Sequence, residues 1–578
     1  RSAEVATPAR EATSPTENVR GDPPLTSTII EVLRCPVMNA TTALSIDDIA
    51  VGTMKMLKVE GHRVCVVRTS DGLHAVDHAC PHEGYGLTQG ELDGDVLTCA
   101  WHNWKFRVTD GACVQGEEAV RTHDVAVAAD GAVQVTINRP DPAELRPQLI
   151  TSLRRGIERN YPGQVARDVV RLLQADANPG ELIWEAIAHG APRAEFGWGH
   201  SVASATDCLS MLDLYEGDQR ALPIVQGIIG VAESERGRPV NPLPEPAPAS
   251  ASTAAAFRAA IESERTSDAQ ALVLAAIERG DAPDDLSGWF TAVVSDHHLS
   301  YGHGAIYTQK AFELLEMIGW ERASTVLPYL VPTLVYGTRE DKLPYMRPFM
   351  KALAGVDLAA LVAAVPVDGW EDDGVLLDAL LGDRRTAPVD AVAAALRTGA
   401  SIDDVLDVVV RAVSERMLRY DVAGEFDFGD DFGWLDITHG LTYAHAVRWH
   451  HGRAVEHDTG TSPDLVRLAM FAAFLGQWTG RHEWHSSVGR RDEIEPLAPD
   501  LATYGDELQR QSLLDGTSAF IVHAHAVKTS RAAALEAARS GSPVPLDATA
   551  RFLAAPKLER FVAATVSRSI DFLNGSTP

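Results

Sequence analysis

The sequence predicts a small all-β domain followed by a large all-α helical-repeat domain. Short apolar runs of strand type, such as MKMLKV and HRVCVVRT, come first, and Asp-Gly pairs typical of tight turns separate them. From about residue 140 the apolar residues recur with helical spacing. In KAFELLEMIGW, for example, Leu314, Leu315 and Ile318 share one face. We therefore expect the β domain over residues 28–139 and the helical domain over residues 140–578.

Two segments are predicted to lie outside these folded parts. Residues 1–27 are polar and contain four prolines, which is typical of a disordered segment. Residues 237–254 include RPVNPLPEPAPASAS, a composition that predicts a linker or surface loop within the helical domain.

Charge and composition exclude several classes of partner. The formal net charge of −29 argues against nucleic acid and anionic membranes as partners. No run of eighteen apolar residues is present, so we expect no membrane span. Six cysteines are too few for a disulfide framework. Four of them are expected to be reduced, which favours a cytoplasmic location: Cys35, Cys65, Cys113 and Cys208.

The stretch CPHEGYGLTQGELDGDVLTCAWHNWKF, residues 80–106, carries the clearest chemical pattern. Cys80 and Cys99 can supply thiolates, and His82 and His102 can supply imidazoles. Two thiolates on one iron and two imidazoles on the other make a Rieske 2Fe-2S centre. Zinc also accepts two Cys and two His, but zinc fingers pair Cys with Cys and His with His. Here each short loop offers one of each, which favours the two-iron cluster.

The stretch closely resembles the Rieske family, with CPHEG and CAWHNWKF in place of its two ligand loops. Asn103 stands where the family usually has Gly, and Asn tolerates the left-handed conformation. The respiratory members have an extra Cys in each loop, and these are absent here, so the resemblance is to the ferredoxin and oxygenase branch. That branch implies electron transfer into another active site. No G-x-G-x-x-G stretch is present, so we expect a separate reductase or ferredoxin to donate the electrons.

The helical region contains an internal repeat. The segments ANPGEL, DAPDDL and ASIDDV each look like a helix N-cap, and downstream of each a histidine opens another helix. These histidines are His200, His303 and His439, and a fourth, weaker copy places His523 in register. Because repeats superimpose, four imidazoles are predicted to converge on a metal, iron being the one we expect. Alternatively, each His bonds a carbonyl in a contact repeated by ancestry.

Nearby carboxylates are candidates for a catalytic role. Glu483, between His482 and His485 in RHEWH, and Asp436 are the main ones, and Asp296 is a further one. A competing pattern is DITHGLTYAH, which matches the D-x2-H-x5-H of Rieske oxygenases. It would make Asp436 a bridge to a neighbouring cluster and place His439 and His445 on the iron. That motif, however, normally lies closer to the cluster and in a β-rich domain.

The helical region also resembles the questin oxidase-like family, through HGLTYAHAVR and the AL-x2-GA helix ends. This resemblance implies oxygenative, Baeyer–Villiger-type chemistry.

Together these patterns predict a Rieske-type iron–sulfur oxidoreductase of the oxygenase kind. Its 2Fe-2S cluster would pass electrons to a His-ligated iron, where O₂ oxidises a small organic substrate. Two alternatives remain open: a haem-binding electron-transfer protein, and a metal-free helical scaffold that docks a partner.

Overall fold

The computed structural model describes most of the chain after residue 43. Described are residues 44–557, without 427–431, 458–459, 481–499 and 516–518, together with a few single positions beyond 557. The predicted disordered segment 1–27 lies outside the described residues. The chain divides into two compact units, Arg1–Arg139 and Pro140–Pro578. Among the described helices, none combines the length and the apolar character needed to cross a bilayer.

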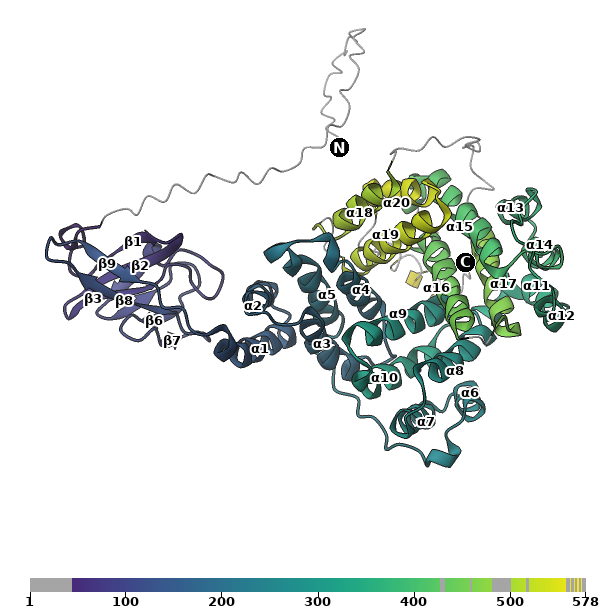
Figure 1. The fold of residues 1–578 in the computed structure, drawn as a ribbon, viewed down its shortest axis with the longest axis horizontal. Helices are drawn as coiled ribbons and strands as arrows, with labels where there is room; N and C mark the ends of the chain where they lie inside the picture. Colours follow the sequence, from purple (N-terminus) through teal and green to yellow (C-terminus); the bar gives the residue numbers. More distant parts are fainter. Residues whose placement is uncertain are drawn as a thin grey trace, which may run out of the picture. The chain divides into compact units, whose positions relative to one another are not determined.

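The first unit contains two antiparallel sheets (Figure 1). One has the strand order β1-β2-β3-β8-β9 and the other β4-β5-β6-β7. The strands within the described residues are β1 (Thr53–Val59), β2 (His62–Thr69), β3 (Gly72–Asp77), β4 (Glu91–Asp93), β5 (Val96–Thr98), β6 (Lys105–Arg107), β7 (Cys113–Gln115), β8 (Thr122–Val127) and β9 (Val133–Thr136).

Strand β2 is buried on both faces, which explains its unbroken apolar run. Val64 and Val66 belong to one apolar cluster, with residues of β1 and β3. Cys65 and Val67 point to the opposite face, because side chains alternate along a strand. There they join a second cluster that contains both Cys80 and Cys99. The face of the first sheet that carries Cys65 and Val67 therefore supports the two cysteine-bearing loops.

The second unit is helical, as predicted, and the described residues from 140 onward contain no named strand. Its helices are α1 (Pro142–Glu158), α2 (Pro162–Gln174), α3 (Pro179–Gly190), α4 (His200–Ser210), α5 (Ala221–Ser234), α6 (Ala254–Glu262), α7 (Thr266–Arg279), α8 (Pro283–Asp296), α9 (His303–Ile318), α10 (Ala323–Tyr336), α11 (Arg347–Leu353), α12 (Leu358–Val362), α13 (Val375–Leu381), α14 (Ala387–Arg397), α15 (Ile402–Arg419), α16 (Trp434–Glu456), α17 (Pro463–Trp478), α18 (Leu501–Ser512), α19 (Phe520–Ser540) and α20 (Val544–Ala554).

The repeated caps begin helices as the sequence indicates. Asn178 accepts a hydrogen bond from the Gly180 amide at the start of α3, and Ser401 forms a capping box with Asp404 at the start of α15. In the middle copy Ala282 provides no side-chain cap, and Pro283 begins α8 instead. The proline-rich segment after α5 is a surface loop. It is held against the helices because Tyr329 donates a hydrogen bond to the Asn241 carbonyl at 2.7 Å.

Four helices of this unit form a closed ring (Figure 1). Helix α4 packs against α9, α9 against α16, α16 against α19, and α19 against α4. One apolar core, running from Leu149 to Phe552 in sequence, surrounds and supports this ring. Each of the four helices therefore presents one face to a shared centre.

Candidate metal centres

The two loops that carry Cys80 and Cys99 have the same backbone turn. The carbonyl of each cysteine accepts a hydrogen bond from the amide four residues later, from Gly84 at 2.8 Å and from Asn103 at 3.1 Å. Each cysteine amide also donates to the carbonyl five residues later, at 2.8 Å in both loops. Gly84 and Asn103 occupy equivalent left-handed positions, with φ of 77° and 61°. The expectation that Asn103 tolerates this conformation therefore agrees with the structure.

The turns place all four predicted cluster ligands together. Both cysteines are buried, and the rings of His82 and His102 lie 4.6 Å apart between centroids. The His102 side chain is 41% exposed, so the histidine side of the site reaches solvent. Tyr85 and Trp101, one from each loop, stack with centroids 4.1 Å apart. This stacking joins the two ligand loops.

The thiol chemistry fits a bound metal cluster. Burial, together with the neighbouring Cys99 thiol, raises the pKa of Cys80 to about 12. Two adjacent buried thiols are stable only in their protonated form unless a cation offsets the thiolate charges. The inner cysteine pair and outer histidine pair match the ligand set of a Rieske centre, with thiolates on one iron and imidazoles on the other.

A second group of possible ligands lies at the centre of the helical ring. His200, His303, His439 and His525 each offer a ring nitrogen, and these nitrogens all lie within 4.8 Å of one another. The Nε2 of His200 lies 3.0 Å from that of His525 and 3.2 Å from that of His303. The Nε2 of His439 lies 2.8 Å from that of His303. One histidine comes from each helix of the ring.

The imidazoles follow the order of the helices around a square. Neighbouring ring centroids are 4.8, 4.4, 4.7 and 4.9 Å apart around the ring, and those of the opposite pair His200 and His439 are 6.5 Å apart. Metal–nitrogen bonds of about 2.0–2.1 Å place ligands at right angles roughly 3.0 Å apart, and tetrahedral ligands roughly 3.4 Å apart. The observed Nε2 spacings match four ligands at right angles.

Hydrogen bonds at the second ring nitrogen fix two of the tautomers. His303 Nδ1 lies 2.5 Å from the Ser300 carbonyl, which can only accept, so Nδ1 carries the proton. The Thr438 hydroxyl donates to the Leu435 carbonyl at 3.0 Å, so its oxygen accepts from His525 Nδ1 at 3.1 Å. In both residues the Nε2 lone pair therefore faces the centre. The Tyr307 hydroxyl lies 3.1 Å from His200 Nδ1 and forms a hydrogen bond that orients this ring.

The electrostatics keep these imidazoles neutral. Burial lowers the pKa of His303 to about 3 and the pKa values of the other three histidines well below their usual range. Lys528, three residues after His525 on α19, is buried and lowers these pKa values further. Its Nζ has no hydrogen-bond partner among the described residues, and burial lowers its own pKa to about 7. Neutral imidazole is the form that binds metals.

The fourth histidine differs from the predicted one. The sequence analysis placed His523 in register, but His525 faces the ring. Two residues on a helix point in nearly opposite directions, so only one of them can reach the centre. His439 and His525 each stand at the sixth position of their helices, α16 and α19. Counting from the helix starts, Trp434 and Phe520, would have identified His525.

The predicted catalytic carboxylates do not join the four histidines. Asp436 accepts a hydrogen bond from the Gly433 amide at 2.9 Å and caps α16. His445 binds Glu536 at 2.8 Å instead of sharing a site with His439, so the D-x2-H-x5-H interpretation is not supported. Asp296 pairs with Arg467 at 3.3 Å. Glu483, together with its neighbours His482 and His485, lies outside the described residues.

Two further histidines of α16, His450 and His451, are internal. His450 is buried between Thr291, whose Oγ1 is 2.8 Å away, and the Ala305 carbonyl. His451 is buried as well. Both are buried because α16 is enclosed by other helices on several sides.

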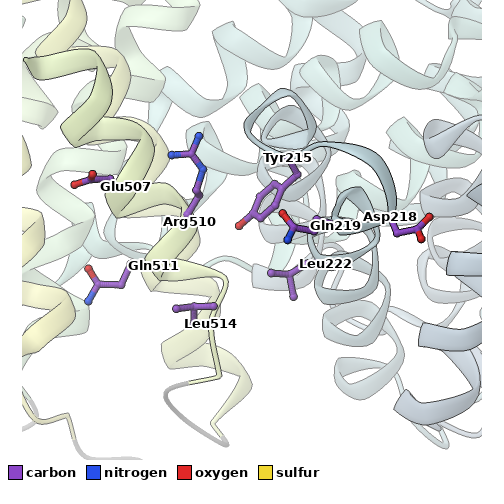
Figure 2. A pocket seen from close by; sticks show the side chains of 8 residues that line it. All are labelled: Tyr215, Asp218, Gln219, Leu222, Glu507, Arg510, Gln511 and Leu514. Carbon is purple, nitrogen blue, oxygen red and sulfur yellow. The ribbon is translucent and has the colours of Figure 1, made fainter. Parts of the chain in front are cut away.

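The helical unit also contains an open pocket of about 550 Å³ between α18 and the turn before α5 (Figure 2). Tyr215 and Leu222 line one side, and Arg510 and Leu514 line the other. None of its lining residues is a histidine, so this pocket is separate from the four-histidine site.

Comparison with known proteins identifies relatives of the first unit. A family model for the Rieske [2Fe-2S] domain matches residues 39–129. The ferredoxin component of the alkene monooxygenase system of Xanthobacter autotrophicus is 38% identical over 68 residues, 12% of this chain and 56% of that protein. Cholesterol 7-desaturase of Xenopus laevis is 36% identical over 77 residues, 13% of this chain and 17% of that protein.

Among solved structures, the ferredoxin of carbazole 1,9a-dioxygenase from Nocardioides aromaticivorans is 26% identical. The match covers 17% of this chain and 95% of that chain, with a TM-score of 0.16.

Proposed function

Because residues 39–129 are a Rieske [2Fe-2S] domain, we propose that the chain is an oxidoreductase of the oxygenase kind. In this proposal the cluster supplies electrons to an iron held by His200, His303, His439 and His525. There, O₂ oxidises a small organic substrate. A separate reductase or ferredoxin reduces the cluster. The relatives named above as a monooxygenase component and a desaturase support this class of reaction for the Rieske unit.

The single observation that carries the second site is the convergence of four Nε2 atoms from four helices within 4.8 Å. At least two of them, on His303 and His525, present lone pairs to the centre because their Nδ1 protons are committed elsewhere. A metal-free protein would have to satisfy this arrangement with hydrogen bonds between neighbouring imidazoles. A cation accepts all four lone pairs at once.

The geometry favours iron over haem and over structural zinc. Adjacent Nε2 atoms only 2.8–3.2 Å apart leave no room for a macrocycle between them. Structural zinc prefers a tetrahedral set, with wider spacing than is found here. Imidazole ligands suit iron, which when bound would supply the site with O₂-reducing chemistry. The protein holds four neutral ligands, fixes their orientation, and surrounds them with buried side chains.

Metal analysis of the purified chain tests this proposal directly. We expect three irons per chain, two in the cluster and one in the ring. His439→Ala and His525→Ala should each reduce the count to two and abolish turnover, while the Rieske signal in electron paramagnetic resonance (EPR) remains. His523→Ala is the matched control, since it alters the same helix two residues away, and it should retain three irons. Two irons in the wild-type chain would instead support a hydrogen-bonded histidine network.

A further inference from the structure

A buried ion pair lies two helical turns beyond the histidines, on two of the same helices. Asp207 is seven residues after His200 on α4, and Lys310 is seven residues after His303 on α9. Lys310 Nζ lies 2.9 Å from Asp207 Oδ1. Since both the histidines and these later residues meet, α4 and α9 run side by side in the same direction. Seven residues of helix span about 10 Å, which sets the depth of the ion pair below the histidine site.

A third charged group connects this ion pair to solvent. Glu313, one turn after Lys310 on α9, places Oε2 2.8 Å from Lys310 Nζ. The Glu313 side chain is 26% exposed, whereas those of Lys310 and Asp207 are 6% and 2% exposed. Gln309 donates to the other carboxylate oxygen of Glu313 at 2.8 Å. The three residues thus form a continuous line from partly exposed to fully buried.

At its buried end, the line reaches a carboxylate oxygen without a partner among the described residues. This atom is Oδ2 of Asp207. Lys528 interacts electrostatically with Asp207 and with the imidazoles, so it lies near both. The other titratable groups that act on this line are Arg531 of α19, near Asp207, and His445 of α16, near Glu313.

Stability alone does not account for this arrangement. Burying an ion costs several kcal/mol, and replacing a buried ion pair by apolar residues is often neutral or stabilising. The two other helices of the ring have Ala446 and Ala532 seven residues after their histidines. The ring can therefore be packed at this level with small apolar side chains, and the charges on α4 and α9 need another explanation.

We propose that Glu313, Lys310 and Asp207 form a path that carries protons from solvent to the four-histidine site. This inference rests on the proposed function, because O₂ reduction there consumes protons: RH + O₂ + 2e⁻ + 2H⁺ → ROH + H₂O. The Rieske cluster supplies the electrons. The Lys310 ammonium passes a proton to Asp207, which releases it toward the four-histidine site. Lys310 then regains a proton from Glu313, which takes one from solvent. After each transfer the three side chains therefore return to their original charges.

The chemistry of the end groups agrees with this direction of transfer. Burial raises the pKa of Asp207, so its carboxyl can hold a proton in transit. The neighbouring Lys310 ammonium lowers the pKa of Glu313, against the effect of burial, so Glu313 readily gives up again a proton that it takes from solvent.

The test measures proton uptake directly. The reduced full-length chain is mixed with O₂ in weakly buffered solution containing a pH-indicator dye, and cluster reoxidation is followed by EPR after rapid freezing. In wild type, proton uptake and reoxidation should occur together. In Asp207→Asn, Lys310→Met and Glu313→Gln both should slow at least tenfold. Added formate, a small proton carrier, should restore the Glu313→Gln rate. Asp168→Asn, a buried carboxylate on α2 outside the ring, should behave as wild type.

Two further measurements separate this path from damage to the fold and from failure of the proposed function. Ferricyanide oxidises the cluster without consuming protons, so all variants should react with it at the wild-type rate and retain three irons. Wild-type proton-uptake rates in iron-loaded Lys310→Met and Glu313→Gln would overturn the path while leaving the proposed function intact. No proton uptake by the wild type would overturn both. If Asp207→Asn loses the ring iron, the Glu313→Gln variant decides whether the path exists. Its amide can still form a hydrogen bond with Lys310, and the change lies at the exposed end of the path.

Discussion

The two candidate metal sites of this protein differ in how the chain brings their ligands together. The Rieske ligands lie within residues 80–102, on two turns with the same hydrogen bonds. The four histidines come from four helices, and the outermost two, His200 and His525, are 325 residues apart. A short loop fixes ligand geometry by its own backbone, whereas the second site exists only when the whole helical ring has assembled. The first site is therefore a local property and the second a property of the fold.

The largest expected effect tests whether the first site is local. His102→Ala should abolish the Rieske EPR signal completely, because the outer iron loses one of its two imidazoles. The helical circular dichroism should be unchanged, since the ligand loops and the helices belong to separate compact units. A variant that keeps a normal Rieske signal would contradict the ligand assignment, and a loss of helical signal would contradict the independence of the two units.

This difference also explains how much could be predicted from the sequence. The four Rieske ligands could be recognised because their spacing in the sequence follows directly from the geometry of the two turns. These ligands are Cys80, His82, Cys99 and His102. His200, His303 and His439 were found through the repeated helix starts. His523 was chosen over His525 because the fourth copy is weak, and a shift of two residues reverses the direction of a helical side chain. Tyr307, Thr438 and Lys528 were missed, since no sequence pattern shows which residues surround an imidazole.

The second prediction concerns acid stability, where the helical site should respond strongly. Burial lowers the pKa of His303 to about 3 and that of the other three histidines well below 6.5. Below pH 6.5 the unfolded chain therefore binds protons that the folded metal-free chain cannot bind. Stability then falls by about 1.4 kcal/mol per pH unit for each such imidazole, down to the folded pKa.

We expect the metal-free helical unit to unfold within the interval from about pH 6.5 to 3, followed by far-UV circular dichroism. A divalent metal such as Co²⁺ binds the folded state and should move the acid midpoint to lower pH. An acid midpoint that does not respond to metal would show that the buried histidines are not ligands.

The third prediction concerns the groups that orient the histidines. Tyr307→Phe removes the hydroxyl 3.1 Å from His200 Nδ1. Loss of such an outer partner typically weakens metal binding by about 10–100-fold, and we expect about tenfold for one of four ligands. Isothermal titration of the metal-depleted site with Co²⁺ measures this. Tyr329→Phe is the control, because it removes a buried hydroxyl that binds the surface loop at Asn241. If the two variants bound Co²⁺ with equal affinity, Tyr307 would not be a partner that supports the metal site.

The smallest expected effect lies within the Rieske unit and compares its two loops at one position. Gly84 and Asn103 both have positive φ, and a Cβ at Gly84 would meet no atom within 4 Å. Any cost of substitution at Gly84 is therefore backbone strain alone.

Gly84→Ala should destabilise the unit by about 1 kcal/mol, because an L-residue in the left-handed region is strained by roughly that amount. Gly84→Asn should cost less, since Asn tolerates the conformation, as it does at Asn103 in the other loop. The midpoint of urea-induced loss of the cluster's visible absorption measures both variants. If Gly84→Asn proved as costly as Gly84→Ala, the two turns would differ in their tolerance despite their common hydrogen bonds, and the equivalence of the two ligand loops would fail.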